Sequence, residues 1–427
     1  MKKTISLPYG RGCVSCDVGE SREINVLRAV NEIAATDSGG DEAALIAAAL
    51  AAPINSPPLS ELARGRKKVV VITSDHTRPV PSRLTLPLLL KEIRTGSPEA
   101  DITVLIAVGS HRATTRAEME EKFGAGFVAR EKIINHDPHD PAGLVSLGTL
   151  PSGGELILNR LAVEADLFVA DGFIEPHQFA GFSGGRKSVL PGIAGLSTVL
   201  ASHNAEFTAH PLARPGSLEG NPFQVDMLHA ARVARLAFIV NVTLTAAKKV
   251  EAAFAGEPEA AHLAGCQHVL RHCGVKAAPA PVVIAGNGGY PLDRNLYQSV
   301  KSLVTAGQCC APGGVIIAVN ECGDGHGGEA FHRDFREAGS PEALWRGIVG
   351  RGRNDTRPDQ WVEQLTADVL RRHKIIAVSQ LEPDILRDFG LIPAPDLGAA
   401  LHLADEITGQ PQAPITVLPE AVAVVIQ

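Results

Sequence analysis

Short apolar runs rich in β-branched residues alternate with helical patterns along this chain, and this alternation constrains the fold more than any other feature. A helical pattern of leucines over residues 83–94 follows the first run, and a charged helical pattern over residues 115–123 follows the second. Buried strands that alternate with helices are typical of parallel sheets. The pattern therefore predicts an α/β protein with mainly parallel sheets. Its first strand-like runs are residues 69–73, 103–108, 166–170 and 238–242.

The segment of residues 276–281 is rich in proline and alanine, which predicts a boundary between two domains. Before it, we expect residues 1–276 to form an N-terminal α/β domain. After it, we expect residues 277–411 to form a smaller C-terminal α/β domain. Because the last apolar run, residues 421–426, resembles a strand, we expect residues 412–427 to return to the N-terminal domain. The strand-like runs of the C-terminal domain are residues 282–285, 315–319 and 375–378.

Charge and composition argue against several classes of function. The chain of 427 residues has a formal net charge of −7, whereas a protein that binds nucleic acid needs clustered Lys and Arg for the phosphates. We therefore expect no nucleic acid as a main partner. No apolar run approaches the roughly 18 residues that a membrane span needs. Two lysines near the N-terminus are not followed by an apolar run, so we expect no signal peptide.

The cysteines indicate reduced thiols rather than a disulfide framework. Their number, seven, is odd, and they are scattered without a regular spacing. Cys13 and Cys16 form a C-x-x-C pair, but the second pair of a zinc ribbon is missing, so we favour free thiols over a redox or metal pair. We interpret His268 and His272, on a helix expected over residues 259–273, as core and surface residues rather than ligands. Reduced thiols without an export signal suggest the cytoplasm.

Polar side chains follow three of the predicted strands at the point where each strand ends. Asp75 and Arg78 follow the first strand, His111 follows the second, and His177 follows the third. In open α/β sheets, ligands bind beyond the carboxyl ends of the strands. We therefore expect these side chains to meet at one edge of the sheet.

A helix expected over residues 295–307 contributes from the C-terminal domain. Its residues Tyr297 and Lys301 are four positions apart and therefore lie on one face. Small ligands often bind between two domains. We therefore expect the active site in the inter-domain cleft.

Residues 175–192 form a glycine-rich loop that ends in Arg186 and Lys187. Glycines let a backbone approach a ligand closely, and successive N–H groups can form an anion-binding concavity. A lysine beside it can act as a nucleophile. The loop therefore predicts a phosphorylated small molecule beside a reactive lysine. A P-loop requires glycine where the chain has Arg186, so an ATPase or kinase of that class is disfavoured. The expected phosphate-binding residues are Ser183, Gly184, Gly185 and Arg186.

Several segments together resemble the nickel-pincer lactate racemase family. They include Asp-His-Thr-Arg-Pro at residues 75–79, Gly-Ser-His at residues 109–111 and His-Gln-Phe-Ala-Gly-Phe-Ser-Gly-Gly-Arg-Lys at residues 177–187. The likeness covers most of the chain in order, and the glycine-rich block is its most specific part. The remaining matching segments are His203-Asn204, residues 218–222, residues 297–301 and Trp361.

The resemblance implies an unusual cofactor held by the N-terminal domain. This nickel-pincer nucleotide is a pyridinium mononucleotide with two sulfur arms and a nickel bonded to a ring carbon. Family members tether it as a thioamide to the lysine that matches Lys187, and the histidine that matches His203 completes nickel coordination. Sulfur donors and a neutral imidazole suit square-planar Ni(II). Dedicated cofactor-maturation enzymes must make the group and are therefore implied partners.

The resemblance also implies an isomerase that inverts Cα of a small 2-hydroxy acid. Hydride passes from Cα to the pyridinium ring and returns to the other face of a planar 2-keto acid. His111 and His177 match the acid–base pair, one for each enantiomer. Arg78 and Lys301 match the groups that hold the carboxylate, and Arg78 can do so with two hydrogen bonds.

The resemblance leads us to expect roles for four further residues. Asp75, which we group with the cofactor-binding residues, is expected to orient Arg78 or a histidine. Gln298 is expected to hydrogen-bond the substrate or a neighbour, and Tyr297 and Trp361 are expected to form a wall of the substrate pocket.

The exact substrate and the class of function leave alternatives open. Bulky Tyr297 and Trp361 favour a small apolar substituent, so lactate leads, but malate, aromatic or sugar acids stay open. The cofactor tether can also vary between family members. Outside the family, His111, His177 and His203 could ligate the metal of a hydrolase. The glycine loop alone could serve a non-catalytic nucleotide binder.

Overall fold

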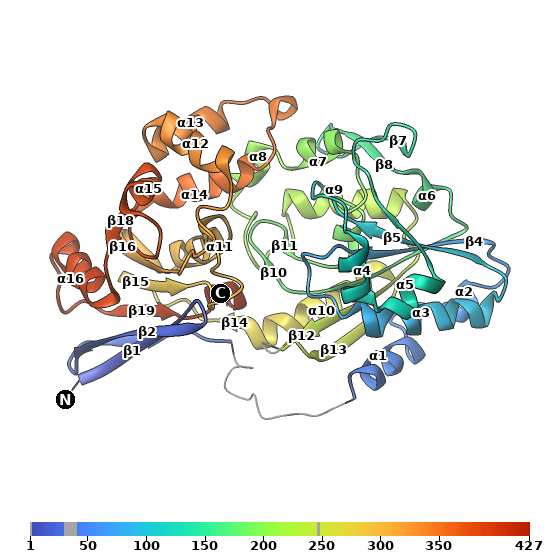
Figure 1. The fold of residues 1–427 in the computed structure, drawn as a ribbon, viewed down its shortest axis with the longest axis horizontal. Helices are drawn as coiled ribbons and strands as arrows, with labels where there is room; N and C mark the ends of the chain where they lie inside the picture. Colours follow the sequence, from blue (N-terminus) through green and yellow to red (C-terminus); the bar gives the residue numbers. More distant parts are fainter. Residues whose placement is uncertain (1, 30–40, 246–247) are drawn as a thin grey trace. The chain divides into compact units, whose positions relative to one another are not determined.

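The computed structural model describes residues 2–29, 41–245 and 248–427, which form two compact units. The larger unit contains residues 41–203 and Leu212–Arg271. The smaller unit contains residues 2–29, Asn204–Pro211 and His272–Gln427. Each unit has its own sheet and its own apolar core (Figure 1).

The larger unit is built on a six-stranded sheet in the order β13-β12-β9-β4-β5-β6. All neighbouring strands run parallel except β13, which is antiparallel to β12. The strands are β4 (Lys68–Ser74), β5 (Asp101–Ala107), β6 (Lys132–Asn135), β9 (Leu167–Phe173), β12 (Phe238–Leu244) and β13 (Val250–Gly256). Because β9, β4 and β5 are neighbours in this order, their carboxyl ends lie side by side.

Helices cover one face of this sheet with an apolar stripe. In α3 (Ser82–Gly96), Leu86, Leu89, Leu90 and Ile93 recur at helical spacing and are almost fully buried. They pack with strand residues such as Val71 and Val104, and each buried leucine contributes about 1.5–3 kcal/mol. The other helices of this unit are α1 (Glu42–Ala51), α2 (Leu59–Leu62), α4 (Arg116–Phe123), α5 (Ala125–Arg130), α6 (Arg160–Val163), α7 (Leu196–Ser202), α9 (Pro222–Val233) and α10 (Pro258–Cys273), which ends at the unit boundary.

Three small elements complete the larger unit. The antiparallel pair β7 (Leu144–Thr149) and β8 (Glu155–Asn159) forms one hairpin. The two-residue strands β10 (Pro176–His177) and β11 (Gly181–Phe182) form a second hairpin inside the glycine-rich segment. A 3₁₀ turn, η2 (Gly185–Ser188), follows it and carries Lys187.

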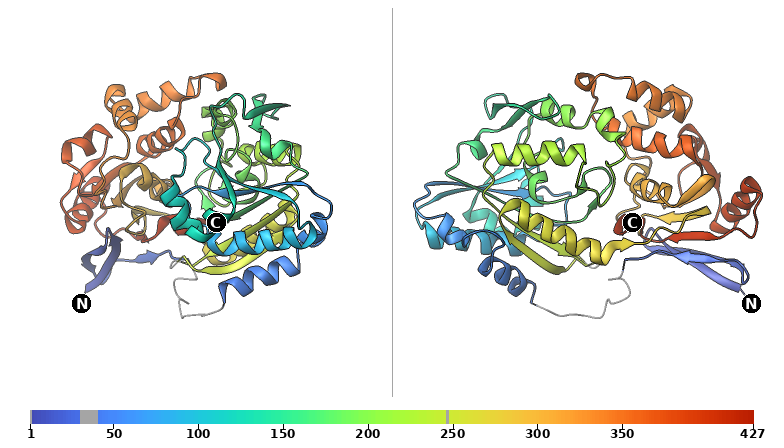
Figure 2. Two further views of the ribbon diagram at one scale, coloured as in Figure 1. Left: turned by 45° about the vertical axis from the view of Figure 1, so that its right-hand side comes forward. Right: turned by 180° about the vertical axis from the view of Figure 1, so that it is seen from behind.

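The smaller unit is built on an all-parallel sheet in the order β18-β17-β16-β15-β19-β3. Helix α16 (Leu397–Thr408) and the hairpin of β1 (Lys2–Tyr9) and β2 (Gly12–Gly19) lie beside this sheet (Figure 2), and their apolar residues join its core. The strands are β3 (Ile24–Val26), β15 (Ala280–Gly286), β16 (Cys310–Val319), β17 (Lys374–Val378), β18 (Ile392–Ala394) and β19 (Ile415–Leu418). The other helices are α8 (Ala205–Thr208), α11 (Leu296–Gly307), α12 (Glu329–Ala338), α13 (Pro341–Val349), α14 (Gln360–Arg372) and α15 (Pro383–Asp388).

The predicted α/β class with mainly parallel sheets is confirmed, but both predicted domain boundaries near the chain ends were wrong. Residues 2–29 belong to the smaller unit, because β3 pairs with β19 and the β1–β2 hairpin shares that unit's core. Residues 412–427 also stay there, because β19 pairs with β15. The expected last strand begins as a 3₁₀ turn over Ala421–Ala423, and only Val425–Ile426 form a strand.

Two further predictions concern membrane-spanning helices and a cysteine pair. No helix in the described part of the sequence has the length and apolar character that a membrane span requires. Cys13 and Cys16 are free thiols on β2. Because they are three positions apart on a strand, their side chains leave opposite faces and do not form a pair.

Candidate active site

The predicted polar residues of the larger unit lie just beyond the carboxyl ends of adjacent strands. Asp75 follows β4, His111 follows β5 by four residues, and His177 follows β9 by four residues. Since the strand order is β9-β4-β5, the structure brings the three segments to one edge of the sheet, as the sequence predicts.

Asp75 and His111 form a tight pair at this edge. Nδ1 of His111 lies 2.6 Å from Oδ2 of Asp75, and Asp75 is only 2% exposed. Burial by itself raises the pKa of Asp75, but the hydrogen bond and charge of His111, with Thr77 and Arg78, bring it down to about 2. The carboxylate therefore stays ionised and accepts the hydrogen on Nδ1. This leaves a lone pair on Nε2 of His111, the arrangement of a general base.

The cation expected to hold a carboxylate, Arg78, is exposed and lies next to this pair. Its Nη1 donates to Oγ1 of Thr77 at 3.0 Å, and Thr77 in turn donates to Asp75. Lys122 of α4 donates to the carbonyl oxygen of Arg78 at 2.7 Å, and burial lowers the pKa of Lys122 to about 8. Sequence reasoning missed Lys122, because a lysine in a charged helix is usually a solvated residue.

His177 and His203 both pack against the ring of Phe179. The ring centroids lie 4.6 Å apart for His177 and Phe179 and 5.4 Å apart for Phe179 and His203. Nδ1 of His177 accepts a hydrogen bond from the backbone N–H of Ala180 at 3.3 Å. The β10–β11 hairpin therefore fixes the orientation of the His177 ring.

His203 has the properties of a neutral metal ligand. Burial and the charge of Lys187 lower the pKa of His203 to about 3, against a smaller opposite effect of the Val199 carbonyl. Nδ1 donates to that carbonyl at 2.9 Å, so the lone pair resides on Nε2. A backbone acceptor that fixes the tautomer is typical of histidines that bind metals. Because the charge of Lys187 affects the pKa of His203, the two side chains are close enough to interact electrostatically.

The glycine loop differs from the anion-binding concavity predicted for it. The N–H groups of Ser183, Gly185 and Lys187 donate to Glu175 O at 2.9 Å, to Asn241 Oδ1 at 2.7 Å and to Gly184 O at 3.1 Å. These three donors are thus used within the protein. The hydrogen bonds therefore do not support the predicted phosphate binding by the N–H groups of Ser183 and Gly185.

The predicted phosphate-binding role of Arg186 also meets a physical obstacle. Its side chain is 2% exposed, and its guanidinium donates to loop carbonyls and to the side chains of Gln224 and His262. A cation whose donors are directed into the protein shapes the loop rather than holding a ligand. The sequence could not reveal this, because it does not show whether an arginine side chain is buried in the protein or directed to a ligand.

The predicted residues of the smaller unit lie on α11 and α14, which pack against each other. Oη of Tyr297 donates to Asp359 at 2.8 Å, and its ring contacts Phe331. Lys301 is exposed, whereas Trp361 is only 9% exposed. The backbone carbonyl of Gln298 accepts from Asn287 at 3.2 Å.

A second set of possible metal ligands lies on α10 and β13. His268 and His272 are one turn apart on the helix, and Glu251 comes from the neighbouring strand. Their ligand atoms lie within 4.8 Å of one another. This differs from the prediction that His268 and His272 are not arranged as ligands, and the set contains none of the residues expected to hold nickel.

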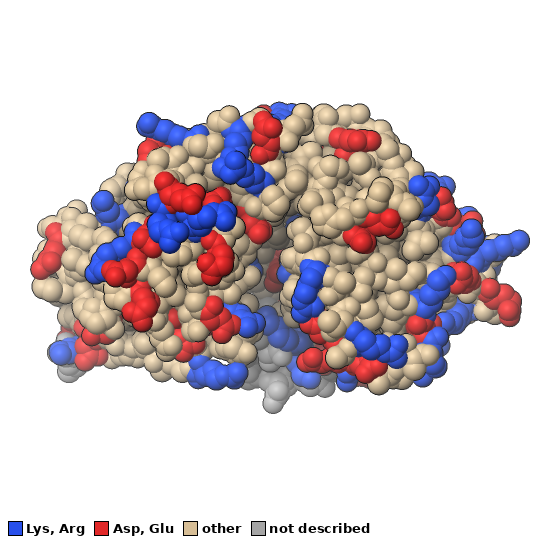
Figure 3. Space-filling model, turned by 45° about the horizontal axis from the view of Figure 1, so that its top comes forward, with Lys and Arg blue, Asp and Glu red and all other residues tan. Residues whose placement is uncertain are grey.

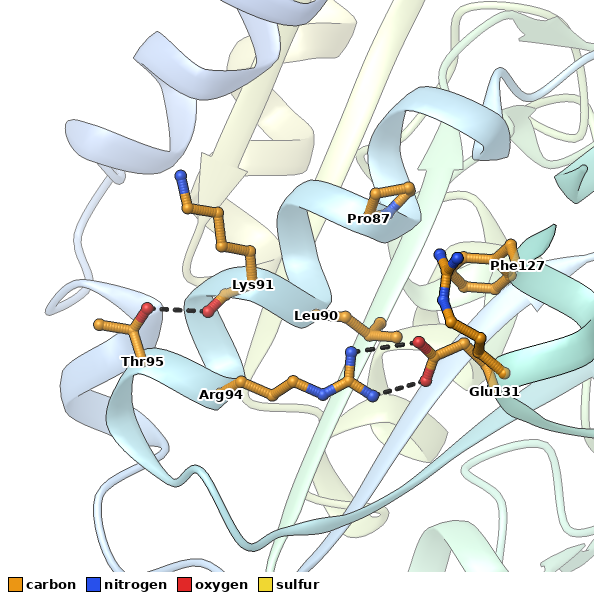
Figure 4. Close-up of a pocket in the computed structure, with 8 residues that line it drawn as sticks. Pro87, Leu90, Lys91, Arg94, Thr95, Phe127 and Glu131 are labelled. Carbon is orange, nitrogen blue, oxygen red and sulfur yellow. Dashed lines mark hydrogen bonds and ion pairs between the residues drawn. The ribbon is translucent and has the colours of Figure 1, made fainter.

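A surface cavity of about 470 Å³ lies between α3 and α5 (Figure 4). Arg94 donates to both carboxylate oxygens of Glu131 at 3.1 and 2.5 Å beside it. It contains none of the predicted site residues, so we assign it no role in the site. Its lining residues are Pro87, Leu90, Lys91, Arg94, Thr95, Phe127, Arg130 and Glu131.

Two family models match the chain, one for each part. The lactate racemase N-terminal domain matches residues 9–216, and the lactate racemase C-terminal domain matches residues 275–426. Racemases are isomerases, and the chain is therefore an isomerase. More specifically, it belongs to the lactate racemase family. This membership leaves the hydrolase and the non-catalytic nucleotide binder without support.

Individual proteins are similar over the whole chain. Lactate racemase of Thermoanaerobacterium thermosaccharolyticum is 48% identical and lactate racemase of Lactiplantibacillus plantarum is 42% identical, each over 424 residues and 99% of both chains. The solved structure of the lactate racemase apoprotein from Thermoanaerobacterium thermosaccharolyticum matches with a TM-score of 0.95 at 47% identity and covers 100% of both chains. A Thermotoga maritima protein, 20% identical with a TM-score of 0.60 over 86% of this chain and 96% of its own, shares the fold alone.

Proposed function

We propose that this enzyme interconverts the two enantiomers of lactate by moving the hydrogen on Cα as a hydride and the hydroxyl hydrogen as a proton. Two relatives that are named lactate racemases, 48% and 42% identical over 99% of both chains, support the substrate. The observation that carries the chemistry is the Asp75–His111 pair at 2.6 Å, because it prepares a histidine nitrogen to accept a proton.

The proton transfers are assigned to the two histidines at the strand ends. Nε2 of His111 accepts the hydroxyl proton of one enantiomer, and the carboxylate of Asp75 stabilises the imidazolium that forms. His177 serves the other enantiomer. Its ring is held by the β10–β11 hairpin and by Phe179, which fixes where its nitrogens point. A fixed ring limits proton transfer to substrates bound in one orientation.

Two of the residues present, His203 and Lys187, fit the metal and the tether of a nickel-pincer nucleotide. His203 is neutral, buried and held in one tautomer by Val199, and Lys187 lies within its electrostatic reach. We therefore assign nickel coordination to His203 and the tether to Lys187. When bound, the group supplies an electrophilic ring carbon that takes a hydride and returns it.

Substrate binding is assigned to residues of both units. Arg78 would hold the carboxylate from the larger unit, next to the Asp75–His111 pair. Lys301 and Gln298 would contact the substrate from α11, while Tyr297 and Trp361 would limit the size of its substituent. Malate, aromatic and sugar acids are the alternatives that a substrate screen must include. The inter-domain cleft, the cofactor-maturation enzymes and the cytoplasm stay predictions.

The distribution of surface charge gives no reason to add a nucleic-acid partner. On the face that Figure 3 presents, Lys and Arg side chains are interspersed with Asp and Glu rather than gathered into a basic patch. The formal net charge of −7 points the same way.

The proposal is tested with protein produced together with the cofactor-maturation enzymes. We expect the purified protein to contain nickel and to carry a mass increment on the peptide that contains Lys187. We also expect it to convert L-lactate to a mixture of enantiomers, measured by chiral chromatography. His111→Ala and His177→Ala should each lower conversion by about 10²- to 10⁴-fold. His139→Ala, at an exposed histidine, is the matched control and should retain activity. Full activity in either variant would contradict the proposal, as would wild-type protein without nickel or adduct.

A further inference from the structure

Arg186 is a buried cation whose hydrogen bonds go to neutral groups. Among the described residues, its guanidinium forms no ion pair. Instead it donates to the carbonyl oxygens of Ala180 and Phe182, each at 3.0 Å, and of Gly184 at 3.2 Å. Burial lowers the pKa of Arg186 only to about 10, so it stays charged at neutral pH. The guanidinium therefore joins the carbonyls of the segment that leads to Lys187.

His262 connects this loop to helix α10. It is 3% exposed, and its Nε2 lies 2.9 Å from Nη1 of Arg186 and 2.9 Å from the carbonyl oxygen of Ser183. In one tautomer Nε2 accepts from Arg186, and in the other it donates to Ser183. Either hydrogen bond ties the loop to α10. Burial and the charge of Arg186 hold the pKa of His262 well below its usual range, so the ring is neutral.

The His262 ring also packs directly on the loop backbone. A Cβ atom built on Gly185 would lie 3.0 Å from two ring carbons of His262, so a side chain there would require the ring to shift. Gly185 has a φ of +52° and donates its N–H to Asn241. Its neighbour in the same 3₁₀ turn, Lys187, donates its N–H to Gly184. His262 therefore contacts the 3₁₀ turn that carries Lys187.

We propose that His262 is a positioning residue that holds the glycine loop in the conformation that presents Lys187. The link to the cofactor rests on the proposed function, in which Lys187 carries the nickel-pincer nucleotide. The effect on the loop itself does not depend on any cofactor. Without His262, Nη1 of Arg186 keeps its carbonyl partners in the loop, but the loop loses the buried hydrogen bond that ties it to α10. The loop would then open locally while the sheet remains folded.

The first experiment measures amide hydrogen exchange in the protein without cofactor. His262→Phe keeps a ring over Gly185 but removes the hydrogen bond, whereas His262→Gln can both accept and donate. We expect exchange in peptides covering residues 183–188 to rise about tenfold or more in His262→Phe, to stay unchanged for β4 and β5, and to recover in His262→Gln. Equal loop exchange in His262→Phe and wild type would overturn the proposal, and so would a uniform rise across the sheet.

The control is His373→Phe, at a buried histidine of the smaller unit that is 7% exposed. It replaces a comparably buried imidazole with a phenyl ring and should leave loop exchange in the larger unit unchanged. A loop response in this control equal to that of His262→Phe would attribute the effect to general destabilisation and overturn the proposal.

The second experiment concerns the cofactor. In protein produced with the maturation enzymes, we expect His262→Phe to carry several-fold less nickel and less adduct on Lys187 per folded protein, with recovery in His262→Gln. Equal loading of His262→Phe and wild type would overturn the link between His262 and Lys187. Wild-type protein that carries neither nickel nor adduct would instead refute the proposed function and leave the exchange result standing.

Discussion

Nδ1 of His111 lies 2.6 Å from a carboxylate oxygen of Asp75, which is buried and holds its charge because its pKa falls to about 2. This contact fixes the hydrogen of the imidazole on the inner nitrogen and the lone pair on the outer one. In the proposed reaction the outer nitrogen is the atom that accepts the hydroxyl proton.

Asp75→Asn should therefore impair catalysis more than binding. An amide can present its NH₂ group to Nδ1 of His111 and so move the hydrogen to Nε2, which then cannot accept a proton. We expect kcat to fall by about 10²- to 10⁴-fold with a smaller change in KM, measured in the direction in which His111 is the base. Asp384→Asn, at a side chain that is 95% exposed, is the control. An unchanged kcat in Asp75→Asn would show that the pair has no catalytic part.

Glu363 of α14 should make the stability of the enzyme fall as pH rises. Burial, with Asp334 as the next contributor, raises the pKa of Glu363 from 4.5 to about 7, and the residue is 3% exposed. Between these values the folded chain binds the proton more tightly than the unfolded chain. The stabilisation is therefore present below about pH 4.5 and is lost as pH rises through about 7.

Glu363→Gln removes this dependence. Relative to wild type, we expect no change in the free energy of unfolding near pH 4.5 and a gain of about 3 kcal/mol at pH 8, measured by chemical denaturation at several pH values. Glu99→Gln, at an exposed glutamate, should show no such trend. A constant difference between Glu363→Gln and wild type at all pH values would contradict the assignment.

Arg186→Lys should destabilise the larger unit although it keeps the charge. A lysine ammonium cannot reach the carbonyls of Ala180 and Phe182 and the side chain of Gln224 together, whereas the guanidinium contacts all three. We expect a loss of about 2–3 kcal/mol in the free energy of unfolding, because hydrogen bonds of a charged group are lost. Arg64→Lys, at an exposed arginine of the same unit, should change it by less than about 0.5 kcal/mol. Equal effects at the two positions would refute the structural role of Arg186.

Gly185→Ala should cost more than the same change at another glycine with positive φ. Gly65 has a φ of +71° and open space around it, so Gly65→Ala should cost only the backbone strain of about 1–2 kcal/mol. At Gly185 the new methyl group would also meet the His262 ring at 3.0 Å. We expect a larger loss of stability there and weaker retention of nickel. Comparable melting temperatures for the two variants would show that the His262 ring can move aside without loss of stability.

The sequence predicts the strand ends of the site well because the relevant signals are local. A buried strand followed by a polar residue can be read directly, and Asp75, His111 and His177 lie where that reading places them. The helix expected over residues 295–307 is also found, as α11 (Leu296–Gly307), and its start is local because Asn295 accepts from the N–H of Gln298. These features depend on residues within a few positions of one another.

The errors concern relations between distant residues. Arg186 is directed to His262, which lies 76 positions later, and no local pattern predicts that contact. The sequence-based prediction missed the pairing of β3 with β19 for the same reason. Strand β3 has only three residues, and its partner lies almost 400 positions later. Its apolar residues are too few to indicate which sheet they join.

The pairing of β3 with β19 also determines when the sheet of the smaller unit can form during synthesis of the protein. Ile24 meets Ile415, and at about 5–20 residues per second the ribosome needs roughly 20–80 s to add the intervening segment. During that interval the first edge strand has been made but its neighbour in the sheet has not. The smaller unit can therefore complete its sheet only after residues 415–417 have been made, and until then the edge of β3 is open to pairing with another chain.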